Sequence, residues 1–199
     1  MQIPLFPLSS VVLPGGILPL RIFEPRYLDM VRDCFKQQSG FGVCLIKAGA
    51  EVGDTAVPLA YGTLVDIVDW DQDDSGLLTI SALGKQKFRI IDTEKTKSGL
   101  LIGTVELLPF ELNAPVPAEL HHLQGTMQQI LDQVSPSIEY TEPAVDDALW
   151  LGSRFVELLP MSAEMRHELL SMDNPIDRLT AVNELLMLMA TKARSGKEE

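Results

Sequence analysis

The first twenty residues of the chain carry no charge, and proline repeatedly interrupts their apolar run. The run belongs to the stretch FPLSSVVLPGGILPLRIFEPRY, residues Phe6 to Tyr27, in which the first basic residue is Arg21. A secretory signal needs its basic residues before the apolar run, and a membrane helix needs ~20 consecutive residues that hold a helix. Proline disfavours that helix. We therefore predict neither a targeting segment nor a membrane span, but short strands IPLFPL and GILPLRIF around a tight turn at LPGG.

A helix is predicted directly after these strands, from Pro25 to about Gln38. Proline is favoured in the first helical turn, and Leu28, Val31 and Phe35 recur at helical spacing. Gly40 is expected to end this helix, because glycine is common just beyond a helix C-terminus.

Together with the two opening strands, the next apolar segments, which are short or alternate with polar residues, give six or seven predicted strands. FGVCLIKA is nearly all apolar, which favours a strand buried on both faces. Short connections between strands are typical of a barrel or sandwich, with the early helix plugging or flanking it. The remaining predicted strands are TAVPLAYGTLVDIVDW, LLTISALG, KQKFRIIDTEK and LLIGTVELLPF.

The pattern changes at NAPVPAEL, residues 113–120, where the strands stop and four helices are predicted. The first two carry apolar stripes at steps of three and four. Ser162 is a good N-cap for the third, and Asn174 followed by Pro175 is a cap for the fourth. We therefore expect a β-rich domain over residues 1–112 and an α-helical domain over residues 113–199.

Composition and charge narrow the possible functions. The chain has 199 residues, 46% of them hydrophobic and 22% charged, as in a globular protein. Its net charge is −12, which disfavours nucleic acid as a partner because phosphates are bound through Lys and Arg. The two cysteines, Cys34 and Cys44, are expected to be buried thiols of a protein in a reducing, cytoplasmic compartment.

No motif in the sequence predicts catalysis, a cofactor or a metal. DWDQDDSG resembles the first half of a calcium loop, but Ala82 stands where the loop requires Glu, so a hairpin turn is predicted. His167-Glu168 lacks the second histidine of a metalloprotease motif, since Ser171 occupies its place. Gly84-Lys85 lacks the remaining residues of a phosphate loop. We expect no cofactor, no metal and no enzymatic activity.

The opening residues carry a resemblance to a known family. Residues Ile3 to Leu8, Val12 to Gly15 and Leu18 to Tyr27 resemble the patterns L-P-L-F-P-L, V-L-x-P-G and L-P-L-x-I-F-E-x-R-Y. These patterns open the N-terminal, substrate-binding domain of Lon proteases, which also occurs as a stand-alone protein. The later run YGTLVDIVDWDQDDSGLLTISALGKQKFRI is similar to the family too, although DSGL replaces D-G-R and Lys87 replaces an arginine.

The resemblance implies a fold and a role. The fold is α+β, with an N-terminal barrel like that of pseudouridine synthases and archaeosine transglycosylases (PUA-like), one inserted helix, and a C-terminal helical bundle. The role is ATP-independent recognition of unfolded or partner polypeptides in a process related to proteolysis, without the ATPase and peptidase modules of full Lon proteases.

Three functional hypotheses stay open at this point. Polypeptide binding is favoured, with Glu24, Arg26, Tyr27 and the weaker candidate Arg89 as binding residues; the alternative is that all four are structural. An RNA-binding PUA-like protein is the second hypothesis, and a small-ligand site in a cleft between barrel and helices is the third. The sequence leaves open whether the protein forms a homodimer, which polypeptide it binds and whether it works with a separate ATPase.

Overall fold

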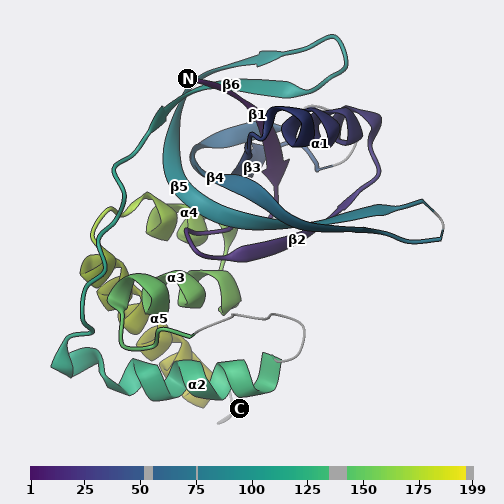
Figure 1. Cartoon of the computed structure of the whole chain (residues 1–199). Coiled ribbons are helices and arrows are strands. Elements are labelled where there is room, and N and C mark those ends of the chain that lie inside the picture. Colours follow the sequence, from purple (N-terminus) through teal and green to yellow (C-terminus); the bar gives the residue numbers. More distant parts are fainter. Residues whose placement is uncertain (52–55, 75, 135–142, 196–199) are drawn as a thin grey trace. The chain divides into compact units, whose positions relative to one another are not determined.

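The computed structural model describes residues 1–51, 56–74, 76–134 and 143–195 (Figure 1). Within these residues the fold is mixed α+β, with six strands, five α-helices and one short 3₁₀ helix. The strands are β1 (Gln2–Leu8), β2 (Ile17–Ile22), β3 (Phe41–Ala48), β4 (Val57–Gln72), β5 (Leu78–Lys95) and β6 (Leu101–Leu107). The helices are α1 (Pro25–Gln37), η1 (Ala118–Leu120), α2 (His122–Val134), α3 (Ala148–Leu158), α4 (Ala163–Ser171) and α5 (Pro175–Ser195).

The described residues group into two compact units. The first comprises Met1–Phe110 and Ser162–Leu170, and the second comprises Glu111–Met161 and Ser171–Glu199. The division into domains 1–112 and 113–199 stays a prediction, because compactness alone does not show which segments fold independently.

The six strands form one sheet in the order β2-β5-β4-β3-β1-β6, and β5 also pairs with β6. Strand β1 runs parallel to β3, and every other pairing is antiparallel. β5 can serve three neighbours because it has 18 residues: its first half pairs with β2, its second half with β6, and much of its length with β4. The pairings among β1, β3, β4, β5 and β6 therefore run in a closed cycle.

Strands β1 and β3 are buried on both faces, as the apolar run FGVCLIKA predicted. Successive side chains of a strand point to opposite faces. Phe6 and Val43 join a cluster that includes Tyr27, Met30, Val31 and Cys34 of α1. Leu5 and Cys44 join a second cluster with Phe88, Leu101 and Val105. The sheet therefore has core on both sides, with α1 covering one of them.

Helix α1 begins at the predicted residue, but the residue that ends it is not the predicted one. Glu24 has extended backbone and Pro25 follows at the first helical position. The left-handed residue beyond the helix is Gln38, with φ 51°, not the predicted Gly40. Gly40 is required for another reason, since a Cβ there would lie 2.0 Å from the carbonyl oxygen of Val65.

The predicted segments LLTISALG and KQKFRIIDTEK are one strand, β5. Gly84 lies inside it and is not a connection. A glycine within a strand often marks close approach of another backbone. Here its N–H donates to the carbonyl of Gly16 at 2.8 Å, and its carbonyl accepts from Gly15 N at 2.9 Å. The hairpin predicted at DWDQDDSG is confirmed by the pairing of Gln72 with Leu78.

The helix starts predicted from capping residues are confirmed. Met165 N donates to Ser162 Oγ at 3.3 Å at the start of α4, and Ile176 N donates to Asn174 Oδ1 at 2.9 Å at the start of α5. The remaining cap, Asp147 at the start of α3, accepts from Leu149 N at 2.9 Å.

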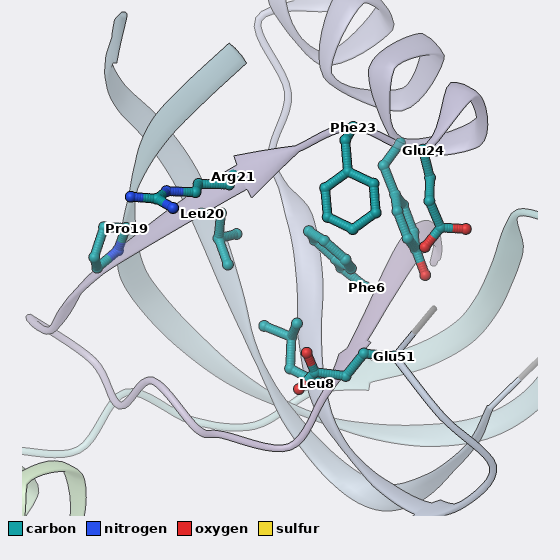
Figure 2. A pocket seen from close by; sticks show the side chains of 9 residues that line it. Phe6, Leu8, Pro19, Leu20, Arg21, Phe23, Glu24 and Glu51 are labelled. Atoms are coloured by element: carbon teal, nitrogen blue, oxygen red, sulfur yellow. The ribbon is translucent and has the colours of Figure 1, made fainter. Parts of the chain in front are cut away.

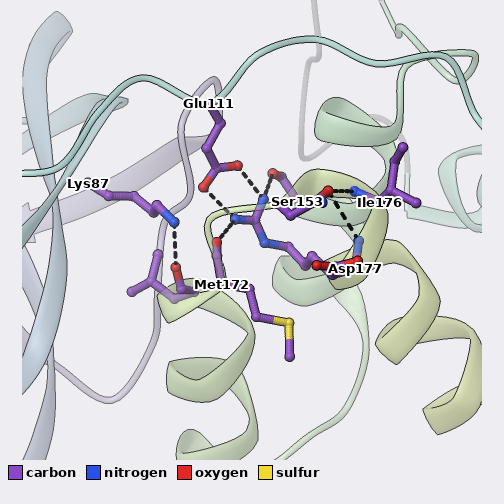
Figure 3. Close-up of polar contacts among 9 residues, drawn as sticks. Lys87, Glu111, Ser153, Met172, Ile176 and Asp177 are labelled. Atoms are coloured by element: carbon purple, nitrogen blue, oxygen red, sulfur yellow. Dashed lines mark hydrogen bonds and ion pairs between the residues drawn. The ribbon is translucent and has the colours of Figure 1, made fainter.

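A buried ion pair lies inside the second unit (Figure 3). The guanidinium of Arg178, on α5, donates to both carboxylate oxygens of Glu111 at 2.7 Å and 2.5 Å. It also donates to Met172 O at 2.5 Å and to Ser153 Oγ, on α3, at 3.4 Å. The side chains of Arg178 and Glu111 are 0% and 4% exposed. This arrangement joins two helices and the segment that enters the unit.

Helix α4 is held within the first unit by two strand residues. Lys87 of β5 is buried, and its Nζ donates to Leu170 O at 3.1 Å. Tyr61 N, on β4, donates to His167 Nε2 at 3.2 Å. No helix in the part of the chain that the structure describes is long and apolar enough to cross a membrane.

Candidate functional site

A pocket opens in the first unit where β1, β2 and the start of α1 meet (Figure 2). Its volume is about 150 Å³. We call it the aromatic pocket, because three of its nine lining residues are aromatic. It is lined by Phe6, Leu8, Pro19, Leu20, Arg21, Phe23, Glu24, Tyr27 and Glu51.

The floor of the aromatic pocket is buried and its mouth is exposed. Phe6 and Tyr27 are buried, with ring centroids 4.0 Å apart, and Phe6 also packs on Phe41 at 6.1 Å. Phe23 is 58% exposed, although it is an apolar side chain next to a well-packed core. Phe23 lines the pocket two residues before Pro25, which starts α1, and we take its exposed ring as the mouth.

Arg26 lies outside the pocket and contacts two residues that line it, Glu24 and Tyr27. It is 9% exposed, pairs with Glu24 at 2.9 Å and donates to Gly99 O at 3.1 Å. Its guanidinium carbon also lies 4.8 Å from the centroid of the Tyr27 ring, within the range of a cation–π contact. Because Arg26 already makes these contacts, it fixes Glu24 and Tyr27 and does not itself line the pocket.

The second carboxylate of the pocket belongs to Glu51. Its Oε1 accepts from both the backbone N–H and the hydroxyl of Ser9. Glu51 lines the pocket together with Leu8 (Figure 2). The pocket therefore combines an aromatic surface with two carboxylates, Glu24 and Glu51, and one guanidinium, Arg21.

The polar side chains that line the aromatic pocket are a phenol, two carboxylates and a guanidinium, from Tyr27, Glu24, Glu51 and Arg21. Burial raises the pKa of Tyr27 to about 12, although nearby Arg26 acts in the opposite direction, so the phenol stays protonated at neutral pH. Among the residues that the structure describes, those that line the pocket include no serine, cysteine, histidine or lysine that could act as a nucleophile with a base beside it. Among the residues that the structure describes, no group of three or more His, Cys, Asp and Glu side chains is placed to hold a metal ion.

The structure brings together three of the four residues singled out from the sequence. Glu24 and Tyr27 line the aromatic pocket and Arg26 supports both. Arg89 is on β5, where its exposed side chain pairs with Glu106 of β6 at 2.6 Å, and it does not line the pocket.

Several lining residues could not be singled out from the sequence. Phe6 and Leu8 belong to β1, and Glu51 follows β3. They reach the pocket because β1 and β3 pair in parallel, with Phe6 opposite Val43, and this register is invisible in the chain order. Phe23 could have been singled out from the sequence. It is an apolar residue directly before the Glu-Pro pair that starts a helix, so it cannot belong to the apolar face of that helix.

Some methionines lie in the core and others on the surface. Met30 and Met127 are buried, whereas Met187 is 57% exposed on α5 next to Leu188, which is 59% exposed. Exposed apolar side chains therefore lie on α5 and also on α1, where Leu28 and Phe35 are 38% and 44% exposed.

A family model and solved structures match the whole fold. The model of the ATP-dependent protease La (LON) substrate-binding domain matches residues 2–187. The crystal structure of a Lon N-terminal domain protein from Xanthomonas campestris is 38% identical, with a TM-score of 0.78, over 92% of this chain and 98% of that chain. The N-terminal domain of Mycobacterium avium complex Lon protease has a TM-score of 0.58 at 15% identity, which supports the fold alone.

The matches to curated relatives cover only a minor part of each relative. Protein cereblon of Xenopus tropicalis is 28% identical over 149 residues, which cover 71% of this chain and 31% of that protein. Protein cereblon of Danio rerio is 28% identical over 112 residues, covering 54% and 26%. The chain thus spans less than a third of the length of these relatives.

Proposed function

Because the chain belongs to the family of the ATP-dependent protease La (LON) substrate-binding domain, we propose that it is a non-catalytic module that binds polypeptides without ATP. The aromatic pocket takes one bulky apolar side chain of an unfolded or partner polypeptide. The observation that carries this proposal is the exposed ring of Phe23 at the mouth of a pocket with a packed aromatic floor.

The size and lining of the pocket favour a polypeptide segment over a folded surface. A volume of about 150 Å³ suits a single large side chain, not a drug-sized ligand. Folded proteins bury most such side chains, and unfolded chains expose them. Full burial of one contributes about 1.5–3 kcal/mol, so a single contact is weak and reversible.

Charge adds a preference to this apolar contact. Glu51 faces the pocket and the chain as a whole has a net charge of −12. A basic residue beside the bound apolar side chain is therefore favoured, and association is expected to weaken as salt screens the attraction.

We extend the proposal to the fold and setting of the module. The closed cycle of strand pairings supports a PUA-like barrel, and the packing of α3 against α5 supports a helical subdomain. We also propose a cytoplasmic, proteolysis-related role, with nucleic acid disfavoured by the negative charge. A homodimer stays a prediction.

Fluorescence anisotropy tests the proposed binding. The probe is fluorescein-labelled α-lactalbumin that has been reduced and alkylated, so that it cannot fold, and native α-lactalbumin is its folded control. We expect saturable binding of the unfolded probe and much weaker binding of the native one. Equal binding of both, or no saturation at high micromolar protein, contradicts the proposal.

Two surface variants test whether the probe binds at the aromatic pocket. Phe23→Ser removes the exposed ring of the pocket and is expected to weaken binding about tenfold, as for a central apolar contact. Phe110→Ser is the matched control, because Phe110 is 69% exposed in the same unit and does not line the pocket. Equal effects of the two variants would show that the probe does not bind at the aromatic pocket.

A further inference from the structure

A second apolar surface lies in the first unit and is lined by residues of α1, of the end of β4 and of the start of β5. It is a groove of about 640 Å³ that shares no lining residue with the aromatic pocket. We call it the α1 groove. Its apolar lining includes Leu28, Phe35, Trp70 and Leu78.

The apolar side chains of the α1 groove are unusually exposed for their size. Trp70 is 58% exposed, Phe35 44% and Leu28 38%. The rings of Phe35 and Trp70 meet edge to face, with centroids 6.4 Å apart, so they steady each other while much of their surface faces solvent. Clustered exposed aromatic side chains of this kind mark interaction surfaces.

The charged residues that line the α1 groove are both basic, in a chain of net charge −12. They are Arg32 and Lys36, 58% and 66% exposed. Their partners Asp29 and Asp33 lie on the same helix but do not line the groove. Exposed ion pairs of this kind contribute little to stability, so the cations can change partner at low cost.

The strand side of the α1 groove adds no negative charge. Trp70 and Gln72 line it, whereas Asp69 and Asp71 alternate with them and therefore point to the other face of β4. The groove thus presents an aromatic surface with a positive edge, the reverse of the acidic aromatic pocket.

We propose that the α1 groove is a second interaction surface, which binds an acidic amphipathic polypeptide segment. An aromatic or leucine side chain of the partner packs against Phe35 and Trp70, and a neighbouring carboxylate binds Arg32 and Lys36. From Leu28 to Lys36 the helix rises about 12 Å, which seats a short segment. The inference rests on the proposed function only in assigning a polypeptide to the groove; its acidic preference is opposite to that of the aromatic pocket.

A second copy of this chain is a poorer occupant on charge grounds. Two copies each carry a net charge of −12, and like charges brought together oppose association. An acidic segment on a separate partner avoids a symmetric contact and needs only the local basic edge.

The test uses two short fluorescein-labelled peptides with identical leucine and phenylalanine positions, one with glutamates and one with lysines between them. Anisotropy with the full chain carrying Phe23→Ser, which removes the exposed ring of the aromatic pocket, is expected to show binding of the acidic peptide at least about tenfold tighter than that of the basic peptide. Arg32→Glu with Lys36→Glu is expected to remove that difference, and Phe35→Ser to weaken the acidic peptide about tenfold. Lys85→Glu and Phe110→Ser are the matched controls, because both positions are exposed and neither lines the groove.

Three results overturn the inference. The first is equal binding of the two peptides, and the second is an acidic peptide indifferent to charge reversal. The third is a dimer in sedimentation velocity that Phe35→Ser dissociates, which assigns the groove to a second copy. The Phe23→Ser variant separates this test from the proposed function, because it should weaken the unfolded probe and leave the acidic peptide unaffected.

Discussion

At the scale of single residues, Arg26 is a motif residue whose contacts lie within the protein. Its sequence neighbours suggested a binding role, but its contacts are internal: Glu24 at 2.9 Å, Gly99 O at 3.1 Å and the ring of Tyr27. A buried arginine of this kind positions its neighbours. The same contacts explain why the residues of the motif lie together.

Replacing Arg26 is therefore expected to cost stability. Arg26→Met leaves Glu24, 17% exposed, without its ion-pair partner and frees the carbonyl of Gly99. We expect the free energy of unfolding in urea to fall by about 2–4 kcal/mol. Arg21→Met is the control, since Arg21 is an exposed residue of the same pocket; equal losses in the two variants contradict the positioning role.

His167 gives stability a specific pH dependence. Its Nε2 accepts from Tyr61 N at 3.2 Å, which requires that nitrogen to be unprotonated. Burial lowers the pKa of His167, and Glu168 opposes this only in part. The unfolded chain therefore binds this proton more readily than the folded chain, so the stabilisation is present above about pH 6.5 and lost as pH falls through the folded pKa.

The His167→Gln variant isolates this effect. Between about pH 7.5 and about pH 5, the drop in thermal midpoint should be smaller in the variant than in the parent protein. His122→Gln is the control, because the side chain of His122 is exposed and its Nε2 bonds the side-chain oxygen of Asn183, not a backbone N–H. An unchanged pH profile in His167→Gln would show that this histidine does not couple to folding.

At the scale of elements, local chemistry predicted helix starts better than strand limits. Pro25, Ser162 and Asn174 start their helices as expected, because a cap acts on the adjacent turn. Gly84 was misread as a strand end because its role depends on a distant backbone. Gly40 was misread for the same reason, since Val65 O approaches it from another strand.

Gly84→Ala tests the close approach that explains this glycine. An added Cβ would lie 2.2 Å from the carbonyl oxygen of Leu13, so β5 or the turn must shift. We expect a loss of about 1–3 kcal/mol in unfolding free energy. Gly125→Ala is a matched control of opposite sign: nothing lies within 4 Å of that position on α2, and alanine should stabilise the helix by about 1 kcal/mol. A neutral Gly84→Ala contradicts the packing described.

The ion pair of Arg178 and Glu111 organises the helices of the second unit. Arg178→Met leaves a carboxylate buried without its partner, and we expect a loss of about 3–5 kcal/mol in urea unfolding. The double variant Glu111→Met, Arg178→Met removes both charges and should lose clearly less than the single variant. Additive losses would show that the two side chains do not act as a pair.

At the scale of the whole molecule, family and α+β class followed from sequence, and the candidate site followed only in part. Glu24, Arg26 and Tyr27 were found because they are adjacent in the chain. Phe6 and Glu51 were not, since they join the site through the parallel pairing of β1 and β3. The α1 groove was equally hidden, because it needs α1 and the end of β4 together.

Photo-crosslinking from position 23 is the most direct test of whether a polypeptide binds at the aromatic pocket. Benzoylphenylalanine replaces Phe23 in one protein and Phe110 in another, and each is irradiated with the reduced and alkylated α-lactalbumin probe. We expect crosslinks from position 23 and few from position 110. An excess of unlabelled unfolded chain should suppress the crosslinks from position 23, and native α-lactalbumin should not. Crosslinks of equal yield from both positions, or none from position 23, would contradict binding at that pocket.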